Sequence, residues 1–288
     1  MTVASEPQVA TIEAQLQRAR HQLASVAVEE PRRTASTLLA AVLQCDQSHL
    51  FAYPERELTE QESARFDTFI ERRAAGEPTQ YLTGVREFFG RNFEVDPTVL
   101  IPRPETEFLI EAVLGEALDD TRILDLCTGS GCIATTLACE QPSNQVFATD
   151  ISADALRIAQ RNSDRHDASV SFLQGDLLDA IRDESFDIIV CNPPYVAERD
   201  RATLSREVRR EPALALFAGT DGFTIYRRFI PAAARVLRPG GLLILELGYD
   251  SLPGVRKLLG EWDRVEIRPD LAGIARVALA RRPPFASR

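Results

Sequence analysis

The sequence predicts an α/β protein with a mostly parallel sheet, an antiparallel hairpin at the end of the sheet, and a small helical domain before it. From Arg122 onward, short apolar runs alternate with helical segments, which is typical of a parallel sheet covered by helices on both faces. The last two runs are joined only by residues 269–275, too few for a helical crossover, so they should be antiparallel. Residues 8–75 show helical spacing throughout.

Residues 1–75 are expected to form the helical domain. Apolar residues at positions 12, 16, 19, 23 and 26 share one face of a first helix, and Pro31 begins a second. Thr59 and Glu62 have the spacing of a capping box for a third helix, which Gly76 is expected to end. Such a domain either supports the fold or holds a macromolecular substrate, and the pattern leaves both readings open.

Residues 76–100 are expected to form a hairpin that links the helical domain to a second domain of residues 101–288. A proline-rich loop follows at residues 101–107, and Pro104 suits the first turn of a helix that continues to Val113. The loop is either a stiff connector or a cover for the active site, in which case Arg103 and Glu105 contact ligand or partner.

The predicted strands of the large domain are short apolar runs separated by helical segments. They are residues 122–126, 145–150, 170–174, 186–191, 242–247, 265–268 and 276–280. Polar motifs follow several of them, at the edge where parallel strands end and ligands bind.

The first of these motifs is a glycine loop. Asp125 is followed by Leu-Cys-Thr-Gly-Ser-Gly at residues 126–131, before a predicted helix, so a ligand can approach the backbone closely. Asp150 ends the next strand, where a carboxylate can accept both hydroxyls of a ribose. Asp176 follows the third strand and can meet the exocyclic amine of adenine, while Leu177 can flank the ring. These positions predict a ligand that contains a nucleoside.

Asn192-Pro193-Pro194-Tyr195 ends the fourth strand and is the most specific motif. It suits methylation of a weakly nucleophilic planar nitrogen, in an amide or an aromatic amine. The Asn192 side-chain oxygen and the Pro193 carbonyl can accept hydrogen bonds from such a nitrogen, and neither proline adds a competing backbone donor. Tyr195 offers a flat face for a planar group. Taken alone, the motif could equally be a turn that closes a buried strand.

Two nucleoside cofactors are compatible with the glycine loop, because residues 129–134 also match the dinucleotide pattern Gly-x-Gly-x-x-Ala. A dehydrogenase has no evident use for the turn at Asn192, whereas a methyltransferase needs an amine-binding turn beside its methyl donor. The motif and the terminal hairpin therefore favour S-adenosylmethionine over NAD.

Composition sets the outer limits. The chain has 288 residues, 44% hydrophobic and 26% charged, with a formal net charge of −10, which disfavours a broad nucleic-acid surface. The five cysteines form no Cys-x-x-Cys pair and the three histidines lie apart from them, so no metal site is expected. The sequence shows no membrane-spanning run and starts without a signal-like segment, so we expect a cytoplasmic protein, and we expect it to be monomeric.

The chain resembles the HemK/PrmC family of protein glutamine methyltransferases, which modify the Gly-Gly-Gln loop of peptide chain release factors. Beside the glycine loop and the Asn192 turn, the resemblance rests on residues 78–84, 100–107, 211–216, 221–222, 226 and 270–273. It implies a Rossmann-like class I methyltransferase fold and direct methyl transfer from S-adenosylmethionine to the side-chain nitrogen (N5) of the glutamine.

The family's site residues carry over onto matching positions. The resemblance implies that Cys127, Thr128, Gly129, Ser130, Gly131, Asp150 and Leu177 contact the cofactor, and that Asn192, Pro193, Pro194 and Tyr195 hold the glutamine amide, with Asn192 also at the cofactor. Cys127 stands where the family usually has glycine, which puts cofactor affinity in question. Ala275 stands where Asp is more usual in Gly-x-Asp-Arg, which puts the stability of the last hairpin in question.

Two other functions remain as alternatives. An adenine-N6 nucleic-acid methyltransferase can use the same turn on a flipped base, but the sequence has no basic stripe and no evident target-recognition domain. A binding module that uses the cofactor without catalysis is disfavoured by the intact Asn192 and glycine loop.

Overall fold

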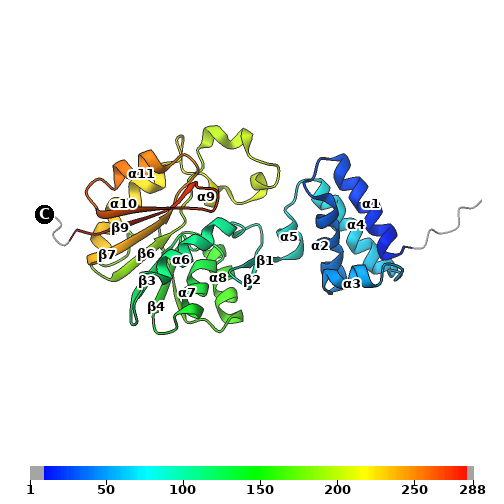
Figure 1. Ribbon diagram of the computed structural model, residues 1–288, viewed down its shortest axis with the longest axis horizontal. Coiled ribbons are helices and arrows are strands. Elements are labelled where there is room, and N and C mark those ends of the chain that lie inside the picture. Colours follow the sequence, from blue (N-terminus) through cyan, green and yellow to red (C-terminus); the bar gives the residue numbers. More distant parts are fainter. Residues whose placement is uncertain (1–9, 284–288) are drawn as a thin grey trace, which may run out of the picture. The chain divides into compact units, whose positions relative to one another are not determined.

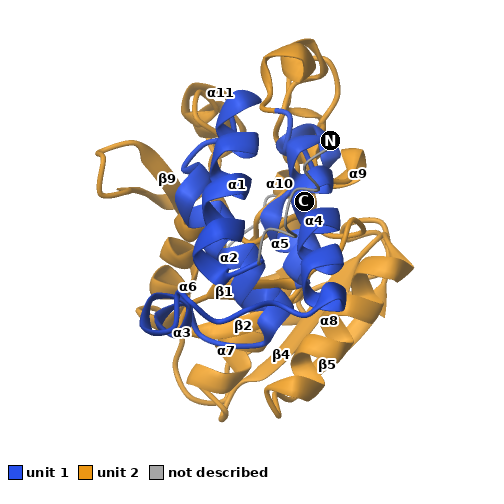
Figure 2. Cartoon of the chain, turned by 90° about the vertical axis from the view of Figure 1, so that its right-hand side faces the viewer, with its two compact units in different colours: residues 1–84, 206–210 blue, residues 85–205, 211–288 orange. Residues whose placement is uncertain are grey.

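The computed structural model describes residues 10–283, and these divide into two compact units. The first unit comprises the chain up to Gly84 together with residues 206–210, and the second comprises residues 85–205 and the chain from Glu211 onward (Figure 2). The predicted segment at residues 8 and 9 lies outside the described residues. Between residues 10 and 283, no helix has the length and apolar character needed to cross a membrane.

The first unit is helical. Its described elements are α1 (Ile12–Ser25), α2 (Pro31–Leu43), α3 (Gln47–Ala52), α4 (Glu60–Ala74) and α5 (Thr79–Thr83) (Figure 1). The predicted capping box is present, because the Thr59 hydroxyl accepts from the Glu62 amide and the Glu62 carboxylate accepts from the Thr59 amide. Gly76 follows α4 with a φ of 94°, a conformation that favours glycine.

Apolar side chains from α1, α2 and α4 fill the core of this unit, including Ile12, Leu38 and Phe66, each fully buried. Residues 206–210 pack with α4 although they are distant in sequence. Arg73, which is buried, forms an ion pair with Glu207, and Arg206 donates to the Ala74 carbonyl at 3.1 Å. A short segment that interrupts the second unit in the sequence thus completes the first.

The second unit begins with the predicted hairpin, in which β1 (Val85–Phe88) and β2 (Arg91–Glu94) pair antiparallel. The proline-rich loop then leads into a short 3-10 helix η1 (Pro104–Thr106), which continues as α6 (Glu107–Leu114). Pro104 therefore occupies the first turn, as the sequence predicts.

In the part of the chain that the structure describes, seven strands form the main sheet in the order β5-β4-β3-β6-β7-β9-β8. The strands are β3 (Arg122–Leu126), β4 (Gln145–Asp150), β5 (Val170–Gln174), β6 (Phe186–Cys191), β7 (Leu237–Glu246), β8 (Asp263–Pro269) and β9 (Ala275–Arg281). Strands β3 to β7 pair in parallel, whereas β9 is antiparallel to both β7 and β8. The predicted fold class, with its terminal hairpin and preceding helical region, is confirmed.

Helices cover both faces of this sheet (Figure 1). Helices α6 and α7 (Cys132–Glu140) pack on one face with α8 (Ala153–Arg165), and α10 (Thr224–Val236) with α11 (Leu252–Leu258) on the other. Successive strand residues belong to opposite cores: Ile123 lies in the first and Leu124 in the second. The loop after β6 carries η2 (Glu198–Thr203), η3 (Val208–Arg210) and α9 (Ala213–Leu216).

The chain order explains where a site can form. From β3 the chain winds outward through β4 and β5, then returns to place β6 on the other side of β3. The carboxyl ends of β3 and β6 therefore lie at the point where the direction of winding reverses, which is where open α/β sheets bind ligands.

Candidate active site

A cavity of about 380 Å³ opens at the carboxyl ends of β3, β4 and β6. Of the residues that the sequence singles out, Cys127, Gly129, Asp150, Asp176, Leu177, Asn192 and Pro194 line it. Thr128, Ser130, Gly131, Pro193, Tyr195, Arg103 and Glu105 do not line it. The structure thus brings one half of the expected residues to one cavity and places the others behind or beside it.

The buried carboxylate of Asp125 holds the glycine loop in place. Asp125 Oδ2 accepts from the Thr128 hydroxyl at 2.6 Å and from the Ala134 amide at 3.2 Å, which ties the loop to the start of α7. Burial raises the pKa of Asp125 to about 7, although both hydrogen bonds act in the opposite direction. The Thr128 side chain therefore stabilises the loop and does not line the cavity.

The two glycines of the loop have different tasks. A side chain at Gly131 would lie 2.8 Å from Ala159 Cβ, so this glycine lets α7 and α8 approach each other. A side chain at Gly129 would meet no atom within 4 Å and would project into open space beside the cavity. Cys127 has a φ of 62°, a region that glycine favours, and this accounts for glycine being the usual residue in the family.

Asp150 is held by backbone donors at the end of β4. Its Oδ2 accepts from the Gly129 amide and its Oδ1 from the Ser152 amide, both at 2.9 Å. Burial raises the pKa of Asp150, and the backbone hydrogen bonds lower it. The carboxylate is thereby fixed in orientation at the wall of the cavity, beside the exposed backbone of the glycine loop.

Asp176 and Leu177 follow β5 on the same wall. The Asp176 carboxylate accepts from Arg228 of α10 at 2.9 Å, and Arg228 also lines the cavity. Leu177 is buried with a φ of 51°, so its side chain is held against the cavity by an uncommon backbone conformation. Leu214 and Ile225 add further apolar wall.

The turn at Asn192 is anchored by residues that the sequence does not link to it. Asn192 Nδ2 donates to the hydroxyl of Thr106 at 3.0 Å, and Thr106 donates to Glu246 at 2.7 Å. The hydroxyl of Tyr195 donates to the other oxygen of Glu246 at 3.2 Å. Because Nδ2 is engaged, Asn192 Oδ1 remains as the acceptor of this amide beside the cavity.

Tyr195 and the proline-rich loop form contacts with other parts of the protein and do not line the cavity. A side chain at Gly248 would lie 2.9 Å from Tyr195 Cδ2, so this glycine makes room for the ring. Arg103 donates to Glu211, whose other oxygen accepts from the Ile101 amide at 3.0 Å. Arg103 thus joins the proline-rich loop to the segment that leads into α9.

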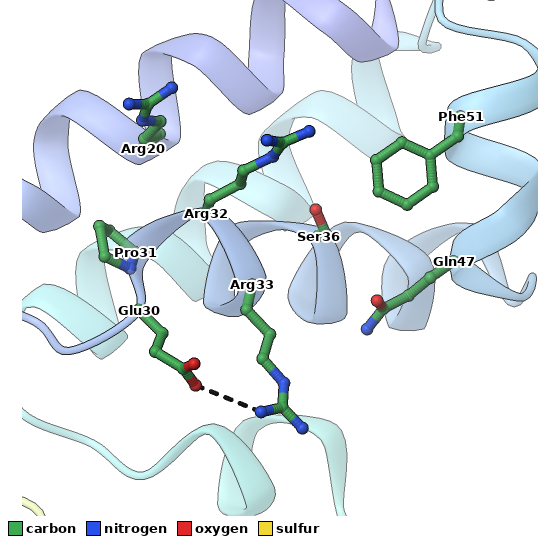
Figure 3. A pocket seen from close by; sticks show the side chains of 8 residues that line it. All are labelled: Arg20, Glu30, Pro31, Arg32, Arg33, Ser36, Gln47 and Phe51. Carbon is green, nitrogen blue, oxygen red and sulfur yellow. Dashed lines mark hydrogen bonds and ion pairs between the residues drawn. The ribbon is translucent and has the colours of Figure 1, made fainter.

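The helical unit has a groove of its own, about 510 Å³ in volume, lined by α1, α2 and α3. Figure 3 shows Arg20, Arg32 and Arg33 around it, with the exposed ring of Phe51 at one side. Arg33 pairs with Glu30 at 3.3 Å, whereas Arg20 and Arg32 form no ion pair with any residue between 10 and 283. The groove is therefore basic and partly apolar.

Comparison with known proteins identifies the family. Residues 14–84 match the PrmC N-terminal domain, and residues 104–220 match the methyltransferase small domain. The release factor glutamine methyltransferase of Koribacter versatilis is 50% identical over 88% of this chain and 92% of its own. That of Moorella thermoacetica is 44% identical over 94% of this chain and 99% of its own.

The chain belongs to the release factor glutamine methyltransferase family. This confirms the resemblance drawn from the sequence motifs. Among solved structures, the catalytic domain of human Mettl16 in complex with an RNA hairpin has a TM-score of 0.54 at 20% identity, covering 81% of this chain and 86% of that one. A methyltransferase from Pyrococcus furiosus has a TM-score of 0.50 at 17% identity, covering 78% of this chain and 100% of that one. These two similarities support the fold.

The cofactor of this methyltransferase is S-adenosylmethionine, and the cavity fits it. The open space beside Gly129 admits a ligand against bare backbone, and the fixed carboxylate of Asp150 suits the paired hydroxyls of a ribose. Leu177 and Ile225 supply apolar surface for a flat ring.

Sequence reasoning missed four residues of this methyltransferase's site. Arg228 and Ile225 lie on α10, where helical spacing gives no sign of a ligand. Thr106 and Glu246 lie behind the Asn192 turn, far from it in sequence. The family motif at residues 100–107 contains Thr106, and it is the one signal that could have drawn attention to this residue.

Proposed function

We propose that this methyltransferase transfers a methyl group from S-adenosylmethionine to the side-chain nitrogen N5 of the glutamine in the Gly-Gly-Gln motif of peptide chain release factors. Family membership at 50% identity over most of the chain supports the reaction and the substrate. The single structural observation that carries the proposal is the Asn192 amide, which borders the cofactor cavity with its nitrogen already engaged.

Each residue at the cavity has a proposed task. Cys127, Gly129 and Asp150 hold the methionyl and ribose parts of the cofactor, and Thr128, Ser130 and Gly131 keep the glycine loop in shape. Asp176 and Leu177 hold the adenine. Bound there, S-adenosylmethionine supplies a methyl group made electrophilic by its positively charged sulfur. Asn192 Oδ1 and the Pro193 carbonyl accept the two N–H groups of the glutamine amide, and Pro194 and Tyr195 shape the turn that presents them.

Positioning accounts for the catalysis in this proposal. An amide nitrogen is a poor nucleophile because its lone pair is delocalised. Two acceptors that hold its hydrogens fix the nitrogen in place and favour the positive charge that develops there as the new bond forms. The released proton passes to water. Arg103 and Glu105 then act by shaping the loop near the turn, with Glu105 available to the partner.

The helical unit is the proposed recognition domain for the release factor. Its groove offers Arg20 and Arg32, which have no ion-pair partner within residues 10–283, beside the exposed ring of Phe51. This combination suits an acidic and apolar surface of a protein partner. The enzyme is proposed to act as a monomer in the cytoplasm, where translation termination takes place.

The test is to incubate the protein with labelled S-adenosylmethionine and, separately, release factors, DNA and RNA, and to locate the label by mass spectrometry. We expect one label on the glutamine of the Gly-Gly-Gln motif, and none on a release factor in which that glutamine is replaced by asparagine. Label on adenine in DNA or RNA, with none on protein, would instead support the adenine-N6 alternative.

A further inference from the structure

A buried carboxylate, Glu246, lies behind the catalytic turn and accepts one hydrogen bond from the turn itself and one from Thr106, to which the turn donates. Glu246 ends β7 and is 1% exposed. Its Oε2 accepts from the Thr106 hydroxyl at 2.7 Å and its Oε1 from the Tyr195 hydroxyl at 3.2 Å. Thr106 in turn accepts from Asn192 Nδ2 at 3.0 Å. One carboxylate therefore connects to both ends of the Asn192–Tyr195 turn.

The number of hydrogens available for donation decides which group donates and which accepts in this hydrogen-bond network. A threonine hydroxyl has one hydrogen to donate, and Thr106 gives it to Glu246 when that carboxylate is ionised. Thr106 can then only accept from Asn192, so the NH2 group of the Asn192 amide must face it. The carbonyl oxygen of the same amide is consequently the atom left for the substrate.

Protonation of Glu246 removes this constraint. A protonated carboxyl can donate to the Thr106 hydroxyl, which frees the hydroxyl hydrogen to turn toward Asn192. The Asn192 amide can then reverse and present NH2, a donor, to the substrate's own NH2 group. Two donors facing each other cannot hold the glutamine nitrogen in place.

We propose that Glu246, in its ionised form, is a positioning residue that acts through Thr106 to fix which atom of the Asn192 amide meets the substrate nitrogen. The effect of Glu246 on methyl transfer rests on the proposed function, whereas the network that joins Glu246 to Asn192 rests on the hydrogen-bond geometry alone. Glu246 itself does not line the cavity.

The surroundings of Glu246 shift its pKa into a range in which the enzyme can be assayed. Burial raises its pKa to about 7, against the hydrogen bonds from Thr106 and Tyr195 and the attraction of Arg276 on β9. Glu105 on η1 acts in the same direction as burial. The other titratable groups that interact with it are Tyr226 of α10, Cys132 of α7 and Cys191 of β6, all with raised pKa values.

The methyl-transfer rate and the stability of the folded protein should change in opposite directions as Glu246 loses its proton. The folded-state pKa lies above the ordinary value of 4.5, so the protonated group contributes stability that is complete below about pH 4.5 and is lost as the pH rises through about 7. The methyl-transfer rate instead rises over the same upper range, because the ionised form orients Asn192. A residue that served stability alone would show the first effect without the second.

The kinetic test compares Glu246→Gln, Thr106→Val and Thr106→Ser with the wild type in single-turnover methyl transfer to a release factor. We expect the first two to lose about 10- to 100-fold in rate, with cofactor affinity by calorimetry nearly unchanged. Thr106→Ser keeps the hydroxyl and should stay within about threefold of the wild type. Thr136→Val is the matched control, because Thr136 is also buried but its hydroxyl has no partner among the described residues.

The rate of the wild type should increase through about pH 7, and this step should be absent in Glu246→Gln. Thermal unfolding shows whether each variant is folded. If Glu246→Gln does not fold, the Thr106→Val and Thr106→Ser pair still decides the question, because it leaves the carboxylate in place. A Thr106→Val variant that transfers methyl at the wild-type rate would overturn the proposal.

A second measurement needs no methyl transfer. In protein labelled with ¹⁵N at asparagine, the side-chain NH2 signal of Asn192, assigned by its loss in Asn192→Ala, should shift with a single step near pH 7. The step should vanish in Glu246→Gln and in Thr106→Val. A signal that does not follow the titration of Glu246 contradicts the positioning role. If the signal does follow it while the wild type methylates no release factor, the network stands and the proposed function fails.

Discussion

The helical unit and the carboxyl edge of the sheet differ in how buried charge is balanced. In the helical unit, buried Arg73 is neutralised by Glu207. At the carboxyl edge of the sheet, Asp125 and Glu246 are fully buried, form no ion pair among the described residues, and have pKa values raised to about 7. Unpaired buried carboxylates cost stability. Their presence at this edge indicates that the methyltransferase unit gives up stability there for its chemistry, whereas the buried arginine of the helical unit is paired as folding alone requires.

The largest expected effect follows from removing the substrate acceptor itself. Asn192→Ala should lower the single-turnover rate by about 10²- to 10³-fold, because one positioned hydrogen-bond partner of the reacting group is lost. Cofactor affinity, measured by calorimetry, should change far less. Asn92→Ala, at an exposed position in β2, is the control and should retain the wild-type rate. Equal losses in rate and in cofactor affinity would contradict the role given to Asn192.

A smaller effect, on binding, is expected at Asp150. Asp150→Ala removes the carboxylate that suits the ribose hydroxyls and also frees the Gly129 amide. We expect the dissociation constant for S-adenosylmethionine to rise about 10- to 100-fold, since two charge-assisted hydrogen bonds are lost. Asp164→Ala, at an exposed position of α8, is the control. If cofactor binding is unchanged in Asp150→Ala, the cavity does not hold the ribose where we place it.

The helical unit should affect binding of the partner without affecting the chemistry. Arg32→Glu is expected to raise the KM for a release factor about 5- to 10-fold, because it reverses a positive charge in the groove. The KM for a short Gly-Gly-Gln peptide and the single-turnover rate should not change. Lys257→Glu on α11 alters the net charge equally and controls for long-range effects. The same loss with peptide and protein would show that the groove is not the site of recognition.

The sequence was most informative where local patterns determine structure. The first four strands of the main sheet have the predicted bounds, because each is a short apolar run between polar loops. The capping box at Thr59 was readable from two residues, and the short connection at 269–275 fixed the antiparallel hairpin. Short α3 was not predicted separately, and β7 begins at Leu237 rather than at 242, because periodicity does not mark such boundaries.

The site was only partly readable for a related reason. Asn192 and Asp150 could be named because each directly follows a strand, where the fold places ligand contacts. Thr106 and Glu246 are 140 positions apart, and their hydrogen bond exists only when the sheet has assembled around them. The local sequence places Glu246 in the apolar predicted strand at residues 242–247, but it does not show which side chains the carboxylate meets. Roles that depend on several distant segments meeting in the interior need the tertiary structure.

The smallest expected effect is in the helical unit and concerns stability alone. Thr59→Ala removes the hydroxyl that accepts from the Glu62 amide at the start of α4, and should destabilise the protein by about 1 kcal/mol in thermal or denaturant unfolding. Thr68→Ala in the same helix is the control, because its hydroxyl bonds only to a backbone carbonyl within the helix. Well below the unfolding transition, both variants should methylate the Gly-Gly-Gln peptide at the wild-type rate. A loss of peptide methylation in Thr59→Ala would show that the sheet edge depends on the fold of the helical unit, and the separation of roles between the two units would no longer hold.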